Sequence, residues 1–132
     1  MSEEKQDLIE YRISRSKETY EEALLLAKNG YWNAVGNRLY YACFYIVNAL
    51  LIKNDLNFSS HNGVRKEFHK SFVKTGLVSI DSGKTYNRLF NLRQEGDYID
   101  FQRFTEEDIN PFIEDVRIVL VEIESILMDL PK

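Results

Sequence analysis

The C-terminal part of the chain carries a hydrophobic pattern that an α-helix would gather on one face. Apolar residues there follow one another by four and three positions in alternation: Ile109, Ile113, Val116, Leu120, Ile123, Leu127 and Leu130. Because an α-helix completes a turn in 3.6 residues, this spacing lines all of them along one stripe. Such a stripe is stable only when other elements cover it, so the rest of the chain must supply packing partners.

The same period recurs upstream, and those partners are therefore predicted to be helices as well. We expect helices over about 9–29, 31–53, 60–74 and 81–96. The first should stop at the pair Asn29-Gly30, and the third should be capped by Ser59 or Ser60 and hold Val64, Phe68 and Phe72 on one face. The second is apolar on most sides and should be the most buried. No segment alternates with the period of a strand, and no repeat or linker divides the chain. The sequence predicts one all-α domain over residues 1–132, an up-and-down antiparallel four-helix bundle with an additional short helix.

The start of the last helix can be placed in two ways. Thr105 and Asp108 resemble a capping box, which would put Pro111 too deep in the helix. Asn110 as the cap would instead leave Pro111 at the first helical position. A short turn over 105–109 that runs into the main helix satisfies both rules.

Composition limits the class of protein. The chain has 132 residues, of which 44% are hydrophobic, and this is enough for a core without disulfides. The single cysteine, Cys43, excludes an intramolecular disulfide and a cysteine-rich zinc site, and suits a reducing compartment. The N-terminal segment is too charged for a signal peptide, and the most apolar stretch, 42–52, is interrupted by Asn48. We expect a cytoplasmic protein with no membrane contact.

The charge is distributed unevenly along the chain. The formal net charge of −4 argues against a uniformly basic, histone-like protein. However, residues 31–92 hold eight basic and three acidic side chains, a balance of +5, between ends of −2 and −7. In this basic middle Lys66, Lys70 and Lys74 are four residues apart and share a helix face. They are either a solvated face or an edge that contacts the phosphates of a nucleic acid or nucleotide.

Two charged side chains continue an inward stripe of the fourth helix. Tyr86, Phe90, Arg93 and Asp97 follow one another by four, three and four positions. Removing Arg93 and Asp97 from water costs several kcal/mol per ion unless a partner or ligand compensates. They could pair with each other and tie the helix end, although an acid C-terminal to its base is the less favourable order.

Arg38 is a second isolated charge, between Val35 and Leu39 on the most apolar helix. Tyr41 and Tyr45 follow on the same face at successive turns. Two arginines and several tyrosines near the bundle interior would suit phosphate binding and base stacking, or a polar network that fixes helix register.

Three blocks of the sequence resemble the HEPN domain, the higher eukaryotes and prokaryotes nucleotide-binding domain, in its small stand-alone prokaryotic branch. They are NRLYYACFYIVNALL (37–51), the step Ser60-His61-Asn62-Gly63-Val64 with Phe68, and LRQEGDY (92–98). The blocks occur in the order typical of that branch, and the resemblance covers about residues 14–127.

The resemblance implies a helical bundle that often forms a homodimer and binds a nucleotide or RNA. Similar proteins are frequently encoded beside a minimal nucleotidyltransferase, as a two-component or toxin–antitoxin-like pair. Other HEPN proteins are metal-independent ribonucleases in which four to six residues separate an arginine from a following histidine. Arg93 matches that arginine, but this chain has Tyr98, Ile99 and Asp100 where the histidine would stand.

Other side chains were weighed as substitutes for the missing imidazole. Tyr98, with an ordinary pKa near 10, is a poor general base at neutral pH. His61 could supply the imidazole from the start of the third helix, whereas His69 is expected on the exposed side among the lysines. Cys43 is most simply a core residue, and the two histidines have only Glu67 between them as a carboxylate, so we expect no metal and no cofactor.

Three hypotheses therefore compete. The leading one is a binding module working with a nucleotidyltransferase partner, whose phosphate site combines the residues Arg38, Tyr41, Arg93, Asp97, Lys66 and Lys70, with Tyr98 beside them. The second is a ribonuclease with Arg93, Tyr98 and His61 as catalytic residues. The third is a purely structural dimer in which the same residues form an interface network.

Overall fold

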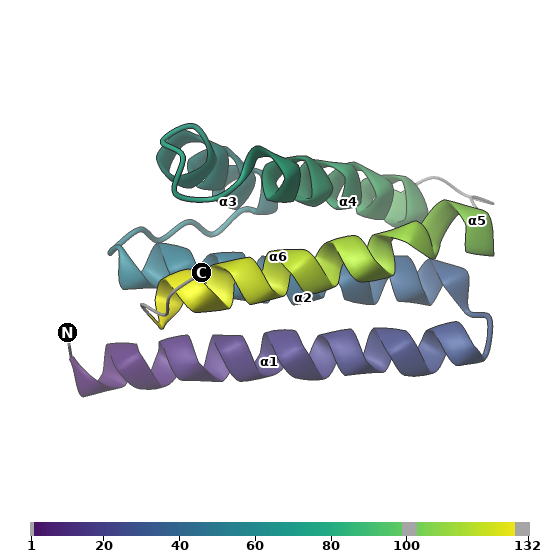
Figure 1. The fold of residues 1–132 in the computed structure, drawn as a ribbon, viewed down its shortest axis with the longest axis horizontal. Helices are drawn as coiled ribbons and strands as arrows, with labels where there is room; N and C mark the ends of the chain where they lie inside the picture. The colour runs from purple at the N-terminus through teal and green to yellow at the C-terminus, as the bar shows by residue number, and fades with distance from the viewer. Residues whose placement is uncertain (1, 99–102, 129–132) are drawn as a thin grey trace.

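The computed structural model describes the backbone of residues 2–98 and 103–128, and the side chains of this part apart from those of 95–98. It is helical without a strand in these ranges, which confirms the all-α prediction (Figure 1). Its elements are α1 (Glu3–Lys28), α2 (Trp32–Lys53), α3 (His61–Phe68), a π-helical turn (His69–Val73), α4 (Ile80–Tyr98), α5 (Glu106–Ile109) and α6 (Pro111–Leu127).

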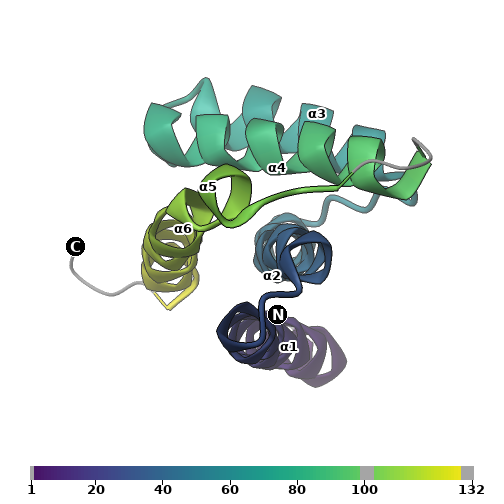
Figure 2. The ribbon, with the colours of Figure 1, turned by 90° about the vertical axis from the view of Figure 1, so that its right-hand side faces the viewer.

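The long helices α1, α2 and α6 alternate in direction along the long axis of the molecule (Figure 1), and α4 lies across them together with α3 (Figure 2). Seen end-on, α2 lies between α1 on one side and the layer of α3 and α4 on the other, with α6 beside it (Figure 2). Eleven residues of α2 are buried, from Val35 to Leu51. The prediction that this helix is the most buried is confirmed, and the other helices pack around it.

Local signals in the sequence place most helix ends. Asn29 ends α1 and Gly30 adopts φ +76°, a conformation that glycine enters without steric cost. The Ser60 hydroxyl caps α3 by accepting a hydrogen bond from the Gly63 N–H at 2.9 Å. One predicted helix end was wrong: α4 was expected to end at about Gly96, but its backbone stays helical to Tyr98.

The beginning of the C-terminal helix is built in two steps. Thr105 and Asp108 form a capping box that starts α5, and Pro111 stands at the start of α6. The predicted short turn leading into the main helix is confirmed. Asn110 is the N-cap residue of α6, as the second placement predicted, but it has helical backbone angles and its side chain makes no capping hydrogen bond.

A π-helical turn follows α3 directly. The Lys74 N–H donates to the His69 carbonyl, five residues back, at 2.8 Å. The predicted inward face of this segment is confirmed, because Val64, Phe68 and Phe72 are all buried.

The expectation that no segment approaches a membrane span needs correction. The 22 residues of α2, with a mean hydropathy of 1.2 in the most apolar window, are long and apolar enough to cross a membrane. In this structure 61% of that window is buried inside the bundle. A central core helix meets the same length and composition criteria, and here the other helices cover its apolar surface.

The core position of α6 can be tested with two isoleucines on the same helix. Ile123 is completely buried, whereas Ile118 is 47% exposed. We expect Ile123→Ala to lower the free energy of unfolding by roughly 2–5 kcal/mol, because it removes buried methylene groups and leaves a cavity. Ile118→Ala is the matched control and should cost under about 1 kcal/mol. Urea unfolding followed by circular dichroism measures both, and equal losses would contradict the described packing.

Candidate functional site

The two arginines singled out in the sequence meet on one tyrosine ring. The guanidinium carbon of Arg38, on α2, lies 5.4 Å from the centroid of the Tyr41 ring. The guanidinium carbon of Arg93, on α4, lies 5.5 Å from the same centroid. A cation at this distance is attracted by the electrons of the ring. The fold therefore brings together two charges that are 55 positions apart in the chain.

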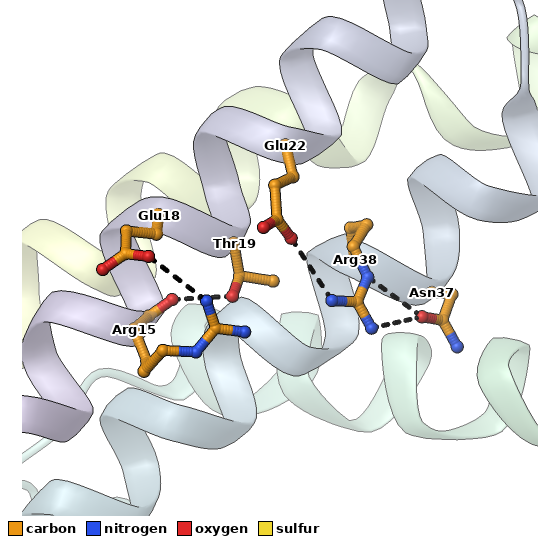
Figure 3. A network of polar contacts seen from close by, with 6 residues as sticks. All are labelled: Arg15, Glu18, Thr19, Glu22, Asn37 and Arg38. Carbon is orange, nitrogen blue, oxygen red and sulfur yellow. Dashed lines mark hydrogen bonds and ion pairs between the residues drawn. The ribbon is translucent and has the colours of Figure 1, made fainter.

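Arg38 lies half-buried at the seam between α1 and α2. Its Nη1 is 3.3 Å from Glu22 Oε1, and its Nε and Nη2 donate to Asn37 Oδ1 at 3.2 and 2.8 Å. Figure 3 shows this network, with Glu22 reaching across from α1. The side chain of Arg38 is 28% exposed and that of Glu22 is 46% exposed. Because this is a partly solvated ion pair, it screens the guanidinium weakly and leaves it able to meet a further anion.

Arg93 also packs on a second ring. Its guanidinium carbon lies 5.4 Å from the centroid of Tyr40, which is fully buried. Half-buried Arg93 therefore rests against the core with its charge beside two aromatic rings, in the inward direction that the stripe predicted. Asp97 and Tyr98 follow it on α4, but their side chains lie outside the described residues, so the expected Arg93–Asp97 pair is not tested.

His61 joins the same cluster from the start of α3. Its Nδ1 lies 2.8 Å from the Tyr40 hydroxyl, and its ring centroid lies 4.6 Å from Phe44 and 5.8 Å from Tyr41. His61 and Arg93 thus contact the same two tyrosines, although they belong to different helices. We define Arg38, Tyr40, Tyr41, His61 and Arg93 as the Tyr41 cluster.

Tyr40 keeps its proton in this environment. Burial raises the pKa of Tyr40 from 10 to about 12. A protonated Tyr40 can donate to His61 Nδ1, and the neutral imidazole then carries its own proton on Nε2. Tyr86, whose ring lies 5.9 Å from that of Tyr40, also has a raised pKa because it is buried. The hydroxyl groups of Tyr40 and Tyr86 therefore stay protonated and neutral at physiological pH.

The predicted lysines stand apart from this cluster. Lys66 and Lys70 are exposed, on α3 and the π-helical turn. The cation of α3 that packs inward is Arg65, whose guanidinium carbon lies 4.7 Å from the Phe90 ring centroid and whose Nη2 donates to Asn62 Oδ1 at 2.7 Å. Sequence reasoning did not use Arg65 in the site, although it stands four residues after His61 on the same helix face.

The expectation for His69 was wrong. It was placed among the lysines on the exposed side, but it is half-buried against α4, where its ring crowds Gly83. Burial lowers the pKa of His69, so it is less easily protonated than a free histidine. Cys43 is a fully buried core residue as expected, and burial raises the pKa of its thiol. Within the described ranges no group of three His, Cys, Asp or Glu side chains could hold a metal ion.

Comparisons of the sequence with known proteins identify one family model and several relatives. The HEPN domain family model matches residues 9–126. A UPF0332 protein of Thermotoga maritima is 43% identical over 129 residues, which are 98% of each chain. Two proteins of Methanocaldococcus jannaschii carry the name "putative toxin". One is 31% identical over 122 residues, 92% of this chain and 90% of that protein. The other is 32% identical over 90 residues, 68% of this chain and 61% of that protein.

The buried state of Tyr40 predicts how stability depends on alkaline pH. The folded-state pKa is raised, so the unfolded chain loses the phenolic proton first. Tyr40 therefore contributes roughly 2–3 kcal/mol to the free energy of unfolding below pH 10, and this contribution is lost as the pH rises toward 12. Tyr40→Phe should flatten the fall in the free energy of unfolding between pH 10 and 12.

Urea unfolding at several pH values measures this slope. Tyr11→Phe is the matched control, because Tyr11 is 56% exposed, and it should leave the slope as in the wild type. An unchanged slope in Tyr40→Phe would contradict the described burial of this hydroxyl.

Proposed function

This chain belongs to the HEPN domain family, and on that premise we propose that it is a nucleotide- or RNA-binding module whose phosphate site is the Tyr41 cluster. The observation that carries the proposal is the convergence of Arg38 and Arg93 on Tyr41, at 5.4 and 5.5 Å. Asp97 and Tyr98 are included through their place on the next turn of α4. Lys66 and Lys70 would act only as exposed charges that attract the ligand from a distance.

The chemistry of the cluster suits a phosphate next to a base. Guanidinium groups offer paired N–H donors that match phosphate oxygens, and both guanidiniums are partly desolvated by the rings beneath them. Tyr41 is half-buried, so part of its ring remains open to a stacking base. Tyr40 and Phe44 support that ring, with centroids at 5.1 and 6.0 Å. The site is therefore held in place before a ligand arrives, which lowers the entropic cost of binding.

We further propose that the protein acts as the toxin-like member of a pair with a minimal nucleotidyltransferase. The two archaeal relatives with toxin names support the toxin-like part of this proposal. The homodimer is a proposal as well. The apolar residues of α2 are used inside the bundle, whereas Ile118 and Val121 on α6 are 47% and 53% exposed. A second copy would cover this exposed apolar pair.

Binding can be tested with glutamine substitutions that remove one charge each. We expect Arg38→Gln and Arg93→Gln each to weaken binding of a labelled mononucleotide and of a labelled six-nucleotide RNA by about 10- to 100-fold, because each removes a charge-assisted contact. Fluorescence anisotropy at fixed salt measures the dissociation constants.

Arg117→Gln serves as the matched control. Arg117 is an exposed arginine of α6 held by Glu114 at 2.6 Å, and its loss should change affinity less than twofold. If the dissociation constants are unchanged in both Arg38→Gln and Arg93→Gln, the proposed binding site is rejected and the structural dimer is favoured.

A second candidate function, a metal-independent endoribonuclease, is favoured by the position of His61. The imidazole and the Arg93 guanidinium lie against the same two rings, so a scissile phosphate beside Arg93 would be near an acid–base group. In such a reaction the ribose 2′-oxygen attacks phosphorus while a base takes its proton. The bond to the 5′-oxygen breaks, that oxygen is protonated, and a 2′,3′-cyclic phosphate forms. Arg93 would stabilise the charge on the phosphoryl oxygens.

Cleavage of a structured RNA in the presence of EDTA tests this reaction. If the chain is such an enzyme, His61→Gln and Arg93→Gln should each lower the rate by about 100-fold or more. His69→Gln is the control, because His69 lies in the π-helical turn after α3, against Gly83 of α4, and should keep the rate. RNA that the wild type leaves intact, with EDTA or with Mg²⁺, would reject the enzyme and leave the binding module.

A further inference from the structure

A second arginine–tyrosine cluster lies one helical turn further along α2. Tyr45 follows Tyr41 by four residues, and its ring is contacted by two arginines of α1. The guanidinium carbon of Arg12 lies 5.8 Å from the Tyr45 ring centroid, and that of Arg15 lies 5.3 Å from it. The Tyr45 cluster, defined as Arg12, Arg15 and Tyr45, repeats the arrangement of Arg38 and Arg93 on Tyr41.

The two clusters form one continuous strip. The ring centroids of Tyr41 and Tyr45 are 6.2 Å apart, and Phe44 lies 6.0 and 6.1 Å from them. Arg38 and Arg15 lie along the same seam between α1 and α2 (Figure 3). Because four residues of an α-helix rise by about 6 Å, the strip offers two aromatic platforms one turn apart, each with its own arginines.

Two arginines of this strip are paired with exposed carboxylates. Among the described side chains, Glu18 pairs with Arg15 and Glu22 pairs with Arg38. Glu18 is 60% exposed and meets Arg15 at 3.4 Å, so it neutralises that arginine only weakly. The Nε of Arg12 is buried and has no hydrogen-bond acceptor among the described groups. An anion that supplied acceptors would relieve this unsatisfied donor.

The backbone beneath the Tyr45 cluster is firmly held. The Ser16 hydroxyl, completely buried, donates to the Ala42 carbonyl at 2.7 Å and joins α1 to α2 at this level. The Thr19 hydroxyl donates to the Arg15 carbonyl at 2.6 Å (Figure 3). The Ser16 bond fixes the height of α1 relative to α2 at this level, so the second cluster is organised without a ligand.

We propose that the Tyr45 cluster is a second phosphate- and base-binding subsite, and that the ligand is a single-stranded oligonucleotide running along α2 from Tyr41 to Tyr45. This inference rests on the proposed function of the Tyr41 cluster and names its ligand class. Aromatic platforms with adjacent cations bind single strands with little dependence on sequence, since every base has a face that can stack. A mononucleotide would occupy only the Tyr41 cluster.

The test compares a labelled mononucleotide with a labelled six-nucleotide RNA on the full chain. The double variant Arg12→Gln/Arg15→Gln should weaken oligonucleotide binding by about tenfold or more and change mononucleotide binding less than twofold. Log affinity falls as log salt rises, and in this variant the fall should be less steep by roughly 1.4, because two phosphate contacts of a single strand are lost. Arg93→Gln should weaken both ligands.

Two further variants separate binding from folding. Lys17→Gln is the matched control on α1, because Lys17 pairs with Glu124 at 2.6 Å away from the strip, and it should bind like the wild type. Arg12→Lys/Arg15→Lys keeps both charges and should keep most of the salt slope.

Oligonucleotide affinity that is unchanged in a folded Arg12→Gln/Arg15→Gln variant would overturn the second subsite alone, provided that Arg93→Gln still weakens binding of both ligands. A wild type that binds neither ligand would overturn the proposed function together with the subsite.

Discussion

The rest of the structure depends on the burial of α2. Its apolar residues are covered on several sides by α1, α4 and α6, which places this helix in the middle of the bundle (Figure 2). The part of α2 that carries Arg38, Tyr41 and Tyr45 is only half-covered. The same packing that forms the core therefore leaves a polar and aromatic strip at its border, where α1 and α4 contribute the other arginines.

Tyr40 connects this strip to the core. It is fully buried, yet its hydroxyl contacts His61 and its ring lies under Arg93. A side chain that is locked by packing on one side and touches two functional groups on the other holds those groups in a defined geometry. Arg38 rests on the Tyr41 ring and on a partly exposed carboxylate, and this arrangement leaves its charge available to an anionic ligand.

Much of the architecture follows from local rules. Helix spacing along the chain, the Ser60 cap, the turn at Gly30 and the stepped start of α6 were all predicted, because each depends on a few neighbouring residues. The errors arose where packing between helices decides. His69 was expected in solvent, but Gly83 on α4 lets that helix come close enough to cover it.

The sequence by itself determined that the chain is helical, which faces are apolar, and that Arg38, His61 and Arg93 are unusual in their places. Only the tertiary structure decided that these three residues meet around Tyr40 and Tyr41, and that Arg12 and Arg15 extend the same strip through Tyr45. The physical reason is distance along the chain. Periodicity specifies the direction of a side chain around its own helix, whereas a contact between helices depends on how their buried surfaces pack together.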